Sequence, residues 1–285
     1  MRVGVYLPIL SAASRDAILT YARVAESLGF DSLWTNSHIA VPVTFGPGYP
    51  YSDDHRPPWS ATSTWLDAMT TLSFVAAATE RVRIGVAVVP LITTDPLTLA
   101  KQAATIDVLS DGRFELGVGG GWLTEEGRAL GHPTDHRTAR MEETIAILRK
   151  AWGQPTFEHT GRFWDLPPLG INPKPPQGAG LPLWIGGHGE EAVRIAAEND
   201  AGLFIWLPRR PERLAEYHRR LRARSKTAPL AASLALAEVD GRWLEAAREM
   251  REAGADLLVI MRRYDERAVD DLTRFAADVL PELTD

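Results

Sequence analysis

Apolar residues follow two alternating patterns along the chain. Short continuous apolar runs, beginning with residues 3–8, alternate with longer stretches in which apolar residues recur at helical spacing. A continuous run predicts a strand buried on both faces, and helical spacing predicts an amphipathic helix. In the first helical stretch Ser14 can cap the start, and Gly29 is placed to end it.

The alternation repeats eight times from one end of the chain to the other. Expected strands cover 3–8, 31–34, 82–89, 114–118, 181–185, 203–207, 232–239 and 256–261; expected helices cover 14–28, 64–79, 95–111, 137–152, 190–198, 211–224, 243–253 and 267–280. Eight alternating units favour an α/β fold of one domain, residues 1–285, built as a (β/α)8 TIM barrel. An open doubly wound sheet is the alternative that the strand count disfavours.

Two long connections interrupt this rhythm. Residues 36–61 are rich in proline, glycine and aromatic side chains, and residues 153–180 contain six prolines. Connections of this length within a compact domain are commonly functional. We expect the first to form an ordered lid and the second to lie over the catalytic face as a further covering insertion.

Composition and charge narrow the class of protein. The formal net charge is -6 with both signs dispersed, which argues against a nucleic-acid partner. The chain has no cysteine, so disulfides and thiolate sites are excluded. No apolar run approaches the roughly 20 residues of a membrane helix, and the first residues lack a signal-peptide pattern. We therefore expect a cytoplasmic protein without a membrane partner.

The carboxyl ends of the expected strands are where a barrel carries its chemistry. No lysine lies at such an end and Glu238 is the one acidic residue there, so we expect neither a Schiff base nor a metal site. The ends are otherwise small, apolar or aromatic, as at Ala87, Val88 and Trp206. These residues suit a flat, uncharged ring that approaches the backbone closely.

Two glycine clusters follow strands. The first, at Gly119, Gly120 and Gly121, precedes Trp122 and does not fit the dinucleotide-binding pattern; it could also be a flexible turn with Trp122 in the core. The second, at Gly186 and Gly187 before His188, opens a helix. Free backbone N–H groups at a helix start bind phosphate, although a plain tight turn would show the same residues.

His38 is the histidine closest behind a strand end in the first half of the chain. On its own it could be structural or catalytic. His132 and His136 are four residues apart, but the neighbouring Gly131 and Pro133 argue against their sharing a helix face as metal ligands.

Several segments together resemble the luciferase-like flavin-dependent superfamily, in particular its branch of coenzyme F420-dependent oxidoreductases. The resemblance spans nearly the whole chain and is densest between Arg83 and Gly131. Its motifs are Leu28-Gly-Phe-Asp-Ser-Leu-Trp34, Arg83-Ile-Gly-Val-Ala-Val-Val-Pro90, Asp95-Pro-Leu-Thr-Leu-Ala-Lys-Gln102, Leu109-Ser-Asp-Gly-Arg-Phe-Glu-Leu-Gly-Val-Gly-Gly-Gly-Trp122 with Glu125-Glu126, Gly161-Arg-Phe163 and Leu183-Trp-Ile-Gly-Gly187.

This resemblance implies a bacterial-luciferase-like barrel that binds F420, or alternatively FMN, across its strand ends. It implies a non-prolyl cis peptide at Ala87-Val88 behind the ring and His38 near the reactive face. Gly119 to Trp122 would flank the ring, the pair Gly186 and Gly187 would hold the phosphate, and His188 and Trp206 would complete the cofactor site. In the lid, Tyr49, Tyr51 and Trp59 would shape the substrate pocket.

At two positions this chain departs from the family pattern, and the residue roles of the family cannot be transferred there. Relatives commonly have Asp-His where this chain has Ser37-His38, and sugar-phosphate dehydrogenase relatives have glutamate in place of Trp122. The resemblance thus implies an F420-dependent oxidoreductase that moves hydride to or from a small organic substrate, as a homodimer. The alternatives are an FMN-dependent monooxygenase, which would need a reductase partner, and a non-catalytic flavin-binding protein.

Overall fold

Eight parallel strands close into a barrel, as the alternating pattern predicted, and the open-sheet alternative is wrong. The computed structural model describes residues 1–285 except 11–12, 45, 47, 53–54, 208–209 and 284–285. The strands follow one another around the barrel in the order β1 (Arg2–Tyr6), β10 (Leu257–Met261), β9 (Leu230–Ala235), β8 (Gly202–Ile205), β7 (Leu183–Gly186), β4 (Phe114–Gly119), β3 (Arg83–Pro90) and β2 (Ser32–Thr35).

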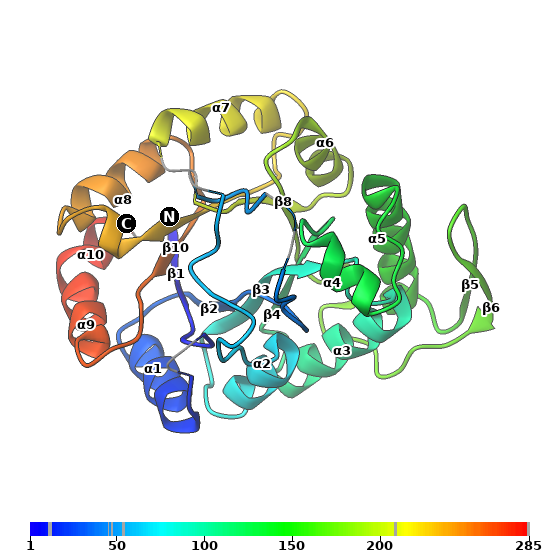
Figure 1. The fold of residues 1–285 in the computed structure, drawn as a ribbon, viewed down its shortest axis with the longest axis horizontal. Helices are drawn as coiled ribbons and strands as arrows, with labels where there is room; N and C mark the ends of the chain where they lie inside the picture. The colour runs from blue at the N-terminus through cyan, green and yellow to red at the C-terminus, as the bar shows by residue number, and fades with distance from the viewer. Residues whose placement is uncertain (11–12, 45, 47, 53–54, 208–209, 284–285) are drawn as a thin grey trace.

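Helices surround the barrel, and Figure 1 looks down into the ring that they form. They are α1 (Arg15–Ser27), α2 (Ala68–Ala76), α3 (Pro96–Leu109), α4 (Thr124–Ala129), α5 (Arg137–Gly153), α6 (Glu190–Glu198), α7 (Pro211–Arg222), α8 (Trp243–Glu252), α9 (Ala268–Asp278) and α10 (Leu280–Leu283). In the part of the chain that the structure describes, no helix is long and apolar enough to cross a membrane.

Helix starts are set by the side chains that the sequence places there. Ser14 accepts a hydrogen bond from the backbone N–H of Ala17 at 3.1 Å. Asp95 accepts from the N–H groups of Leu97 and Thr98, both at 2.9 Å, and Pro96 occupies the first helical position. These contacts satisfy N–H groups that a helix cannot pair internally, so α1 and α3 begin where the sequence predicts.

The inside of the barrel is filled by large aromatic side chains rather than open. Trp34, Trp184 and Phe204 meet there, with ring centroids 5.6 to 6.2 Å apart. Trp34 is fully buried between two glycines on the neighbouring strands: a Cβ on Gly4 or Gly85 would lie within 2.9 Å of its ring. This packed aromatic layer fills the barrel interior beneath the carboxyl ends of the strands.

One expected strand is shorter than predicted. The run 232–239 was expected to be a strand ending near Glu238, but β9 ends at Ala235 and residues Leu236–Glu238 form a 3-10 turn, η2. Glu238 is exposed in this turn and does not lie at a strand end. Apolar character along the chain does not distinguish a strand from a short turn that continues it.

The expectation for residues 153–180 is wrong. This insertion forms the antiparallel hairpin β5 (Phe157–Thr160) and β6 (Asp165–Leu169), followed by the 3-10 turn η1 (Gly178–Gly180). It packs against the outside of α5 and α3, where Lys174 donates to the Ala151 carbonyl at 2.6 Å, and Figure 1 shows the hairpin beyond α5, away from the barrel axis. Helix α5 ends, and β7 begins, at the face opposite the catalytic one, so the insertion has no path across the mouth.

Candidate active site

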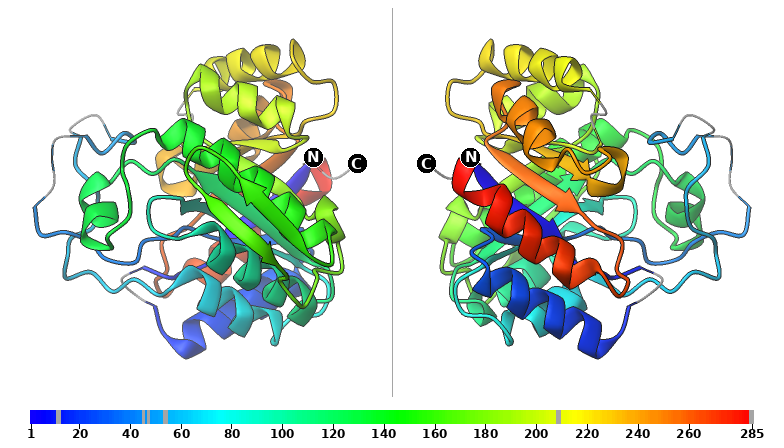
Figure 2. Two further views of the ribbon diagram at one scale, coloured as in Figure 1. Left: turned by 90° about the vertical axis from the view of Figure 1, so that its right-hand side faces the viewer. Right: turned by 90° about the vertical axis from the view of Figure 1, so that its left-hand side faces the viewer.

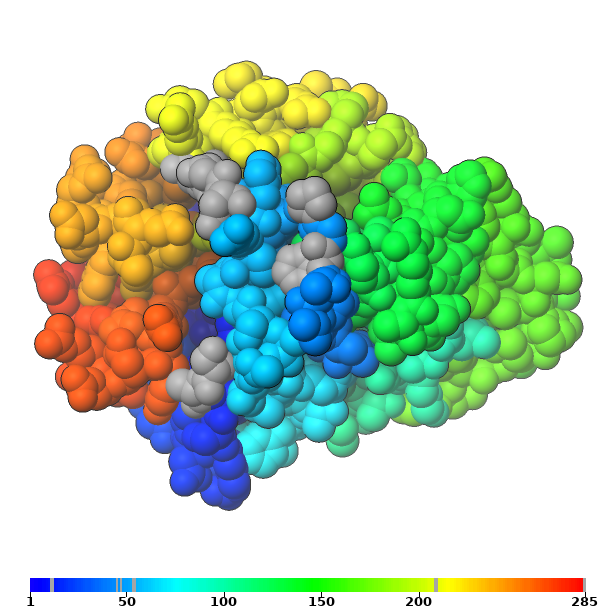
Figure 3. Space-filling view, viewed as in Figure 1, coloured from blue at the N-terminus to red at the C-terminus, as the bar shows by residue number. Residues whose placement is uncertain are grey.

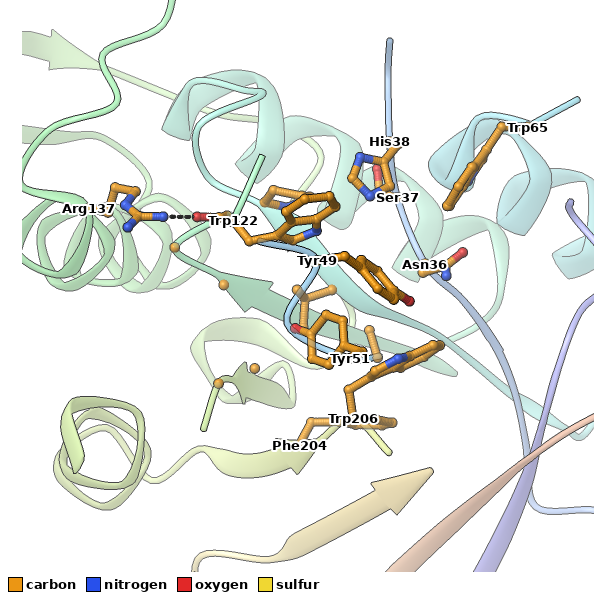
Figure 4. Close-up of a pocket in the computed structure, with 18 of the residues that line it drawn as sticks. Asn36, Ser37, His38, Tyr49, Tyr51, Trp65, Trp122, Arg137, Phe204 and Trp206 are labelled. Carbon is orange, nitrogen blue, oxygen red and sulfur yellow. Dashed lines mark hydrogen bonds between the residues drawn. The ribbon is translucent and has the colours of Figure 1, made fainter. Parts of the chain in front are cut away.

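A cavity of about 270 Å³ opens at the carboxyl ends of the barrel strands. Backbone at the ends of β3, β4 and β7 lines one side, and aromatic side chains line the other (Figure 4). Its lining residues are Asn36, Ser37, His38, Tyr49, Tyr51, Trp59, Trp65, Ala87, Val88, Pro90, Gly119, Gly120, Gly121, Trp122, Arg137, Gly186, Gly187, Phe204 and Trp206.

The lid covers this cavity. Residues 36–61 contain no helix or strand among those described, and they cross the face of the barrel in Figure 3. In Figure 2 the same blue segment lies beside α4 at the end of the molecule away from the two termini. Tyr49 contacts the rings of Tyr51, Trp59 and Trp122 at centroid distances of 5.3, 6.1 and 5.5 Å. Aromatic packing thus fixes the lid to the barrel mouth.

Strand β3 has a bulge beneath the cavity. Its register with β4 shifts between Val86 and Val89, and the Ala87-Val88 peptide bond is cis, as the family pattern implied. Tyr6 supports the bulge from inside the barrel, with its hydroxyl 3.4 Å from the Ala87 carbonyl. Burial raises the pKa of Tyr6 well above its usual value, so this hydroxyl stays protonated and can donate.

The glycines around the bulge are required by Val88. A Cβ on Gly186 would lie 2.5 Å from Val88 Cγ1, and one on Gly119 would lie 2.9 Å from Val88 Cγ2. Both distances are too short for carbon atoms, so larger residues would displace the Val88 side chain. Glycine therefore serves packing at these two positions, in addition to leaving the cavity wall open.

Gly187 and His188 lead into α6. Gly187 has a φ of 158° and lines the cavity, whereas His188 lies beside it, 5.6 Å from the Tyr51 ring. Burial lowers the pKa of His188 to about 4, and the positive charge of Arg213 acts in the same direction. His188 is consequently neutral near pH 7 and offers no positive charge to an anion.

His38 is held by a buried carboxylate. Its Nδ1 lies 2.6 Å from Oε2 of Glu126, whose side chain is 1% exposed. The other oxygen of Glu126 accepts the backbone N–H groups of Ile39 and Ala40 at 2.6 and 3.0 Å. Helix α4 thereby fixes both the imidazole and the backbone that follows β2.

Three aromatic side chains surround the same imidazole. The rings of Trp59, Trp65 and Trp122 lie 5.3, 4.8 and 6.1 Å from that of His38. These indoles exclude most water from the ring while His38 still lines the cavity.

Two of the residues that line the cavity carry a buried polar atom without a protein partner among the described residues. The indole nitrogens of Trp65 and Trp206 are buried and make no hydrogen bond within the described residues. Arg137, at the start of α5, is the one arginine or lysine among the described residues that line the cavity, and it donates to the Gly121 carbonyl. A cation at this place fits a ligand that carries an anionic group.

The site residues predicted from the sequence lie together around this cavity. Every one of them except His188 lines the cavity, and His188 adjoins it through Tyr51. Sequence reasoning missed Trp65 and Arg137 and gave no role to Glu126, because it searched strand ends and these residues lie elsewhere. The carboxylate at the mouth comes from Glu126, and Glu238 instead lines a separate pocket beside Arg242.

The arrangement suits the binding of a flat, largely apolar ring. Within the described residues no group of three or more histidine, aspartate or glutamate side chains could hold a metal ion. The cavity instead offers apolar walls, a cation beside glycine backbone, and one imidazole whose second nitrogen is available for proton transfer.

Comparisons with known proteins agree with this geometry. A family model described as luciferase-like monooxygenase matches residues 1–279. An uncharacterized protein of Mycobacterium tuberculosis is 35% identical over 188 residues, which is 66% of this chain and 66% of that protein. The match therefore spans about two thirds of that relative's length.

Named relatives fall into two cofactor classes. The F420-dependent glucose-6-phosphate dehydrogenase of Amycolatopsis mediterranei is 29% identical over 71% of this chain and 56% of its own. The oxygenase component of a flavin-dependent trigonelline monooxygenase from Acinetobacter baylyi is 25% identical over 67% of this chain and 48% of its own. Among solved structures, an F420-dependent secondary alcohol dehydrogenase shares the fold, with a TM-score of 0.79 at 16% identity over 100% of this chain and 99% of that one.

Proposed function

Because the chain belongs to the luciferase-like monooxygenase family, we propose that it is an F420-dependent oxidoreductase that transfers hydride to or from a small organic substrate. The observation that carries the proposal is the position of His38, which lines the cavity with its Nδ1 bound to Glu126 and its Nε2 free of any hydrogen bond to the described residues. Hydride transfer to a carbonyl, or from an alcohol, requires such a group to give or take one proton.

The residues present fit F420. When bound, the deazaflavin accepts or gives a hydride and does not activate oxygen. Gly187 and the cation Arg137 line the same cavity and supply N–H groups and positive charge for its phosphate.

The lid restricts the substrate. Tyr49, Tyr51 and Trp59 present aromatic surface to the cavity, and Trp122 occupies the position next to His38. Among the described residues, no lysine lines the cavity to bind a second phosphate. We therefore assign a small, largely apolar alcohol, ketone or similar compound as substrate in preference to a sugar phosphate. The named F420-dependent relative supports the choice of cofactor.

A flavin-dependent monooxygenase is the second candidate, favoured by the relative from Acinetobacter baylyi. On that account the same cavity holds FMN, and a separate reductase supplies it in the reduced form.

Equilibrium titration with F420 and with FMN, followed by cofactor fluorescence, tests the assignment. We expect F420 to bind at micromolar concentrations and more tightly than FMN. Tighter binding of FMN, together with oxygen consumption when reduced FMN is supplied, would transfer the assignment to the monooxygenase. Binding of neither cofactor would contradict both.

Turnover then tests His38. A panel of small alcohols and ketones is incubated with the F420-loaded protein, and F420 absorbance is followed. We expect His38→Ala to retain F420 and lose at least about 100-fold in rate, the usual contribution of a positioned acid or base. His132→Ala is the matched control, since His132 lies outside the cavity.

A further inference from the structure

We propose that Glu126 is a positioning residue that determines which nitrogen of His38 carries the proton. The inference deepens the proposed function and rests on it, because it concerns the group to which we assign proton transfer. It comes from the contacts of the Glu126 carboxylate, to which the sequence pattern gave no role.

The two oxygens of Glu126 perform different tasks. Oε1 accepts the N–H groups of Ile39 and Ala40 at 2.6 and 3.0 Å, so it is committed to the backbone after β2. Oε2 lies 2.6 Å from Nδ1 of His38. Both side chains are almost fully buried, with exposed fractions of 1% and 9%, and water therefore competes little for either contact.

The chemistry of this contact fixes the tautomer. An ionised carboxylate can only accept hydrogen bonds, so Nδ1 of His38 must carry the hydrogen. The neutral ring then has a lone pair on Nε2, the nitrogen left for the cavity. His38 can accept a proton from substrate there without first rearranging, and the nearby negative charge stabilises the positive ring that results.

Among the residues that the structure describes, His38 has no charged partner other than Glu126. The rings packed around His38 are the indoles of Trp59, Trp65 and Trp122, which carry no formal charge. The neighbouring Glu125 points elsewhere, with its Oε1 3.0 Å from the Gly46 N–H in the lid. The residue directly before His38 is the uncharged Ser37, and the carboxylate next to His38 comes from α4.

Substitution by glutamine separates the two tasks of Glu126. In Glu126→Gln the amide oxygen can keep the Ile39 and Ala40 bonds, while the amide NH₂ faces His38 Nδ1. An NH₂ group is a donor, so Nδ1 must become the acceptor and the hydrogen moves to Nε2. The lid-side backbone keeps its anchor, but the proton is on the wrong nitrogen for accepting another at the cavity.

The test is ¹⁵N NMR of histidine-labelled protein without cofactor or substrate. The chain has 7 histidines, and the His38 signals are identified by their loss in His38→Asn. We expect the Nδ1–H form of neutral His38 in the wild type, the Nε2–H form in Glu126→Gln, and the wild-type form in Glu125→Gln. An Nε2–H form in the wild type, or an unchanged Nδ1–H form in Glu126→Gln, would overturn the proposal.

Cofactor titration of the same variants keeps this test separate from that of the function. We expect Glu126→Gln to bind F420 as tightly as the wild type, and to lose kcat with little change in KM once a substrate is found. If neither cofactor binds while the tautomers behave as expected, the proposed function fails and the role of Glu126 in orienting His38 stands. If Glu126→Gln does not fold, the wild-type spectrum alone decides.

Discussion

The side chain of Val88 occupies the space that a Cβ of Gly186 would need. The two positions belong to β3 and β7, strands that do not pair with each other, and the distance from that Cβ to Val88 Cγ1 would be 2.5 Å. Val88 reaches across because β3 bulges at this point. The bulge and the glycine are therefore one structural unit at the floor of the cavity.

Gly186→Ala should create a steric clash with the Val88 side chain. Adding Val88→Ala to the same protein should remove that clash. We expect Gly186→Ala to lower the free energy of unfolding by about 1–3 kcal/mol, the usual cost of overpacking, and to weaken F420 binding. In the double variant only the Val88 Cβ remains, at an ordinary 3.5 Å, so stability and binding should largely return. Urea unfolding of the four proteins measures the coupling, and additive losses would refute it.

A second prediction concerns acid stability. Glu115 on β4 is buried and pairs with the partly exposed Arg2 and Arg83, and its Oε2 accepts the Trp184 indole N–H at 2.6 Å. Burial acts to raise the pKa of Glu115, but the two arginines lower it more, and the net pKa lies below the usual 4.5. Such a carboxylate stabilises the folded state above pH 4.5 and loses this contribution as the pH falls through its folded-state pKa.

Glu115→Gln should therefore lower the free energy of unfolding most at neutral pH. We expect a loss of about 1.5–3 kcal/mol at pH 7, because two partly exposed arginines lose their carboxylate partner, and a smaller difference from wild type as the pH falls below 4.5. Chemical unfolding at several pH values measures this, with the exposed Glu158→Gln as control. A difference that stays constant with pH would mean that the carboxylate charge does not stabilise the fold.

A third prediction concerns Arg137 and the phosphate. If this cation assists Gly187 in holding the cofactor phosphate, Arg137→Ala should weaken FMN binding about 5- to 10-fold and leave riboflavin, which lacks the phosphate, unaffected. The loss should shrink at high salt because Arg137 is exposed. Arg128→Ala, an exposed arginine outside the cavity, is the control. Equal losses for FMN and riboflavin would remove Arg137 from the phosphate site.

A fourth prediction tests the packing beneath the site. In Gly85→Ala the new Cβ would lie 2.5 Å from Cζ3 of Trp34, whose ring is fully buried and cannot move aside. We expect a loss of about 1–3 kcal/mol in stability and a lower Tm. Gly180→Ala, where no atom lies within 4 Å of the new Cβ, should change neither. A wild-type Tm for Gly85→Ala would show that the barrel interior is less tightly packed.

The barrel could be read from the sequence because its elements are local. A buried strand such as β10 is continuous in apolar residues, and Asp95 with Pro96 signals a helix start within a few positions. Most site residues follow from the same logic, since parallel strands end at one face. The path of residues 153–180 was misjudged although the predicted barrel fixes it, because a connection from a helix to the next strand lies at the face opposite the carboxyl ends of the strands.

The contacts across the mouth could not be predicted. Glu126 and His38 are 88 positions apart, and the sequence contains Glu125 beside Glu126 with nothing to show which one turns inward. Helix α4 decides this by placing Glu126 on its buried face and Glu125 toward the lid. The same holds for the packing reason behind Gly186, which depends on a valine from a strand that is not its neighbour.

A crystal structure of the protein with F420 tests the central claim most directly. We predict the deazaflavin ring within the cavity against Ala87 and Val88, with the phosphate at the backbone of Gly186 and Gly187 and His38 beside the ring. A ring bound outside the strand-end mouth, or a phosphate held away from that glycine pair, would contradict the account.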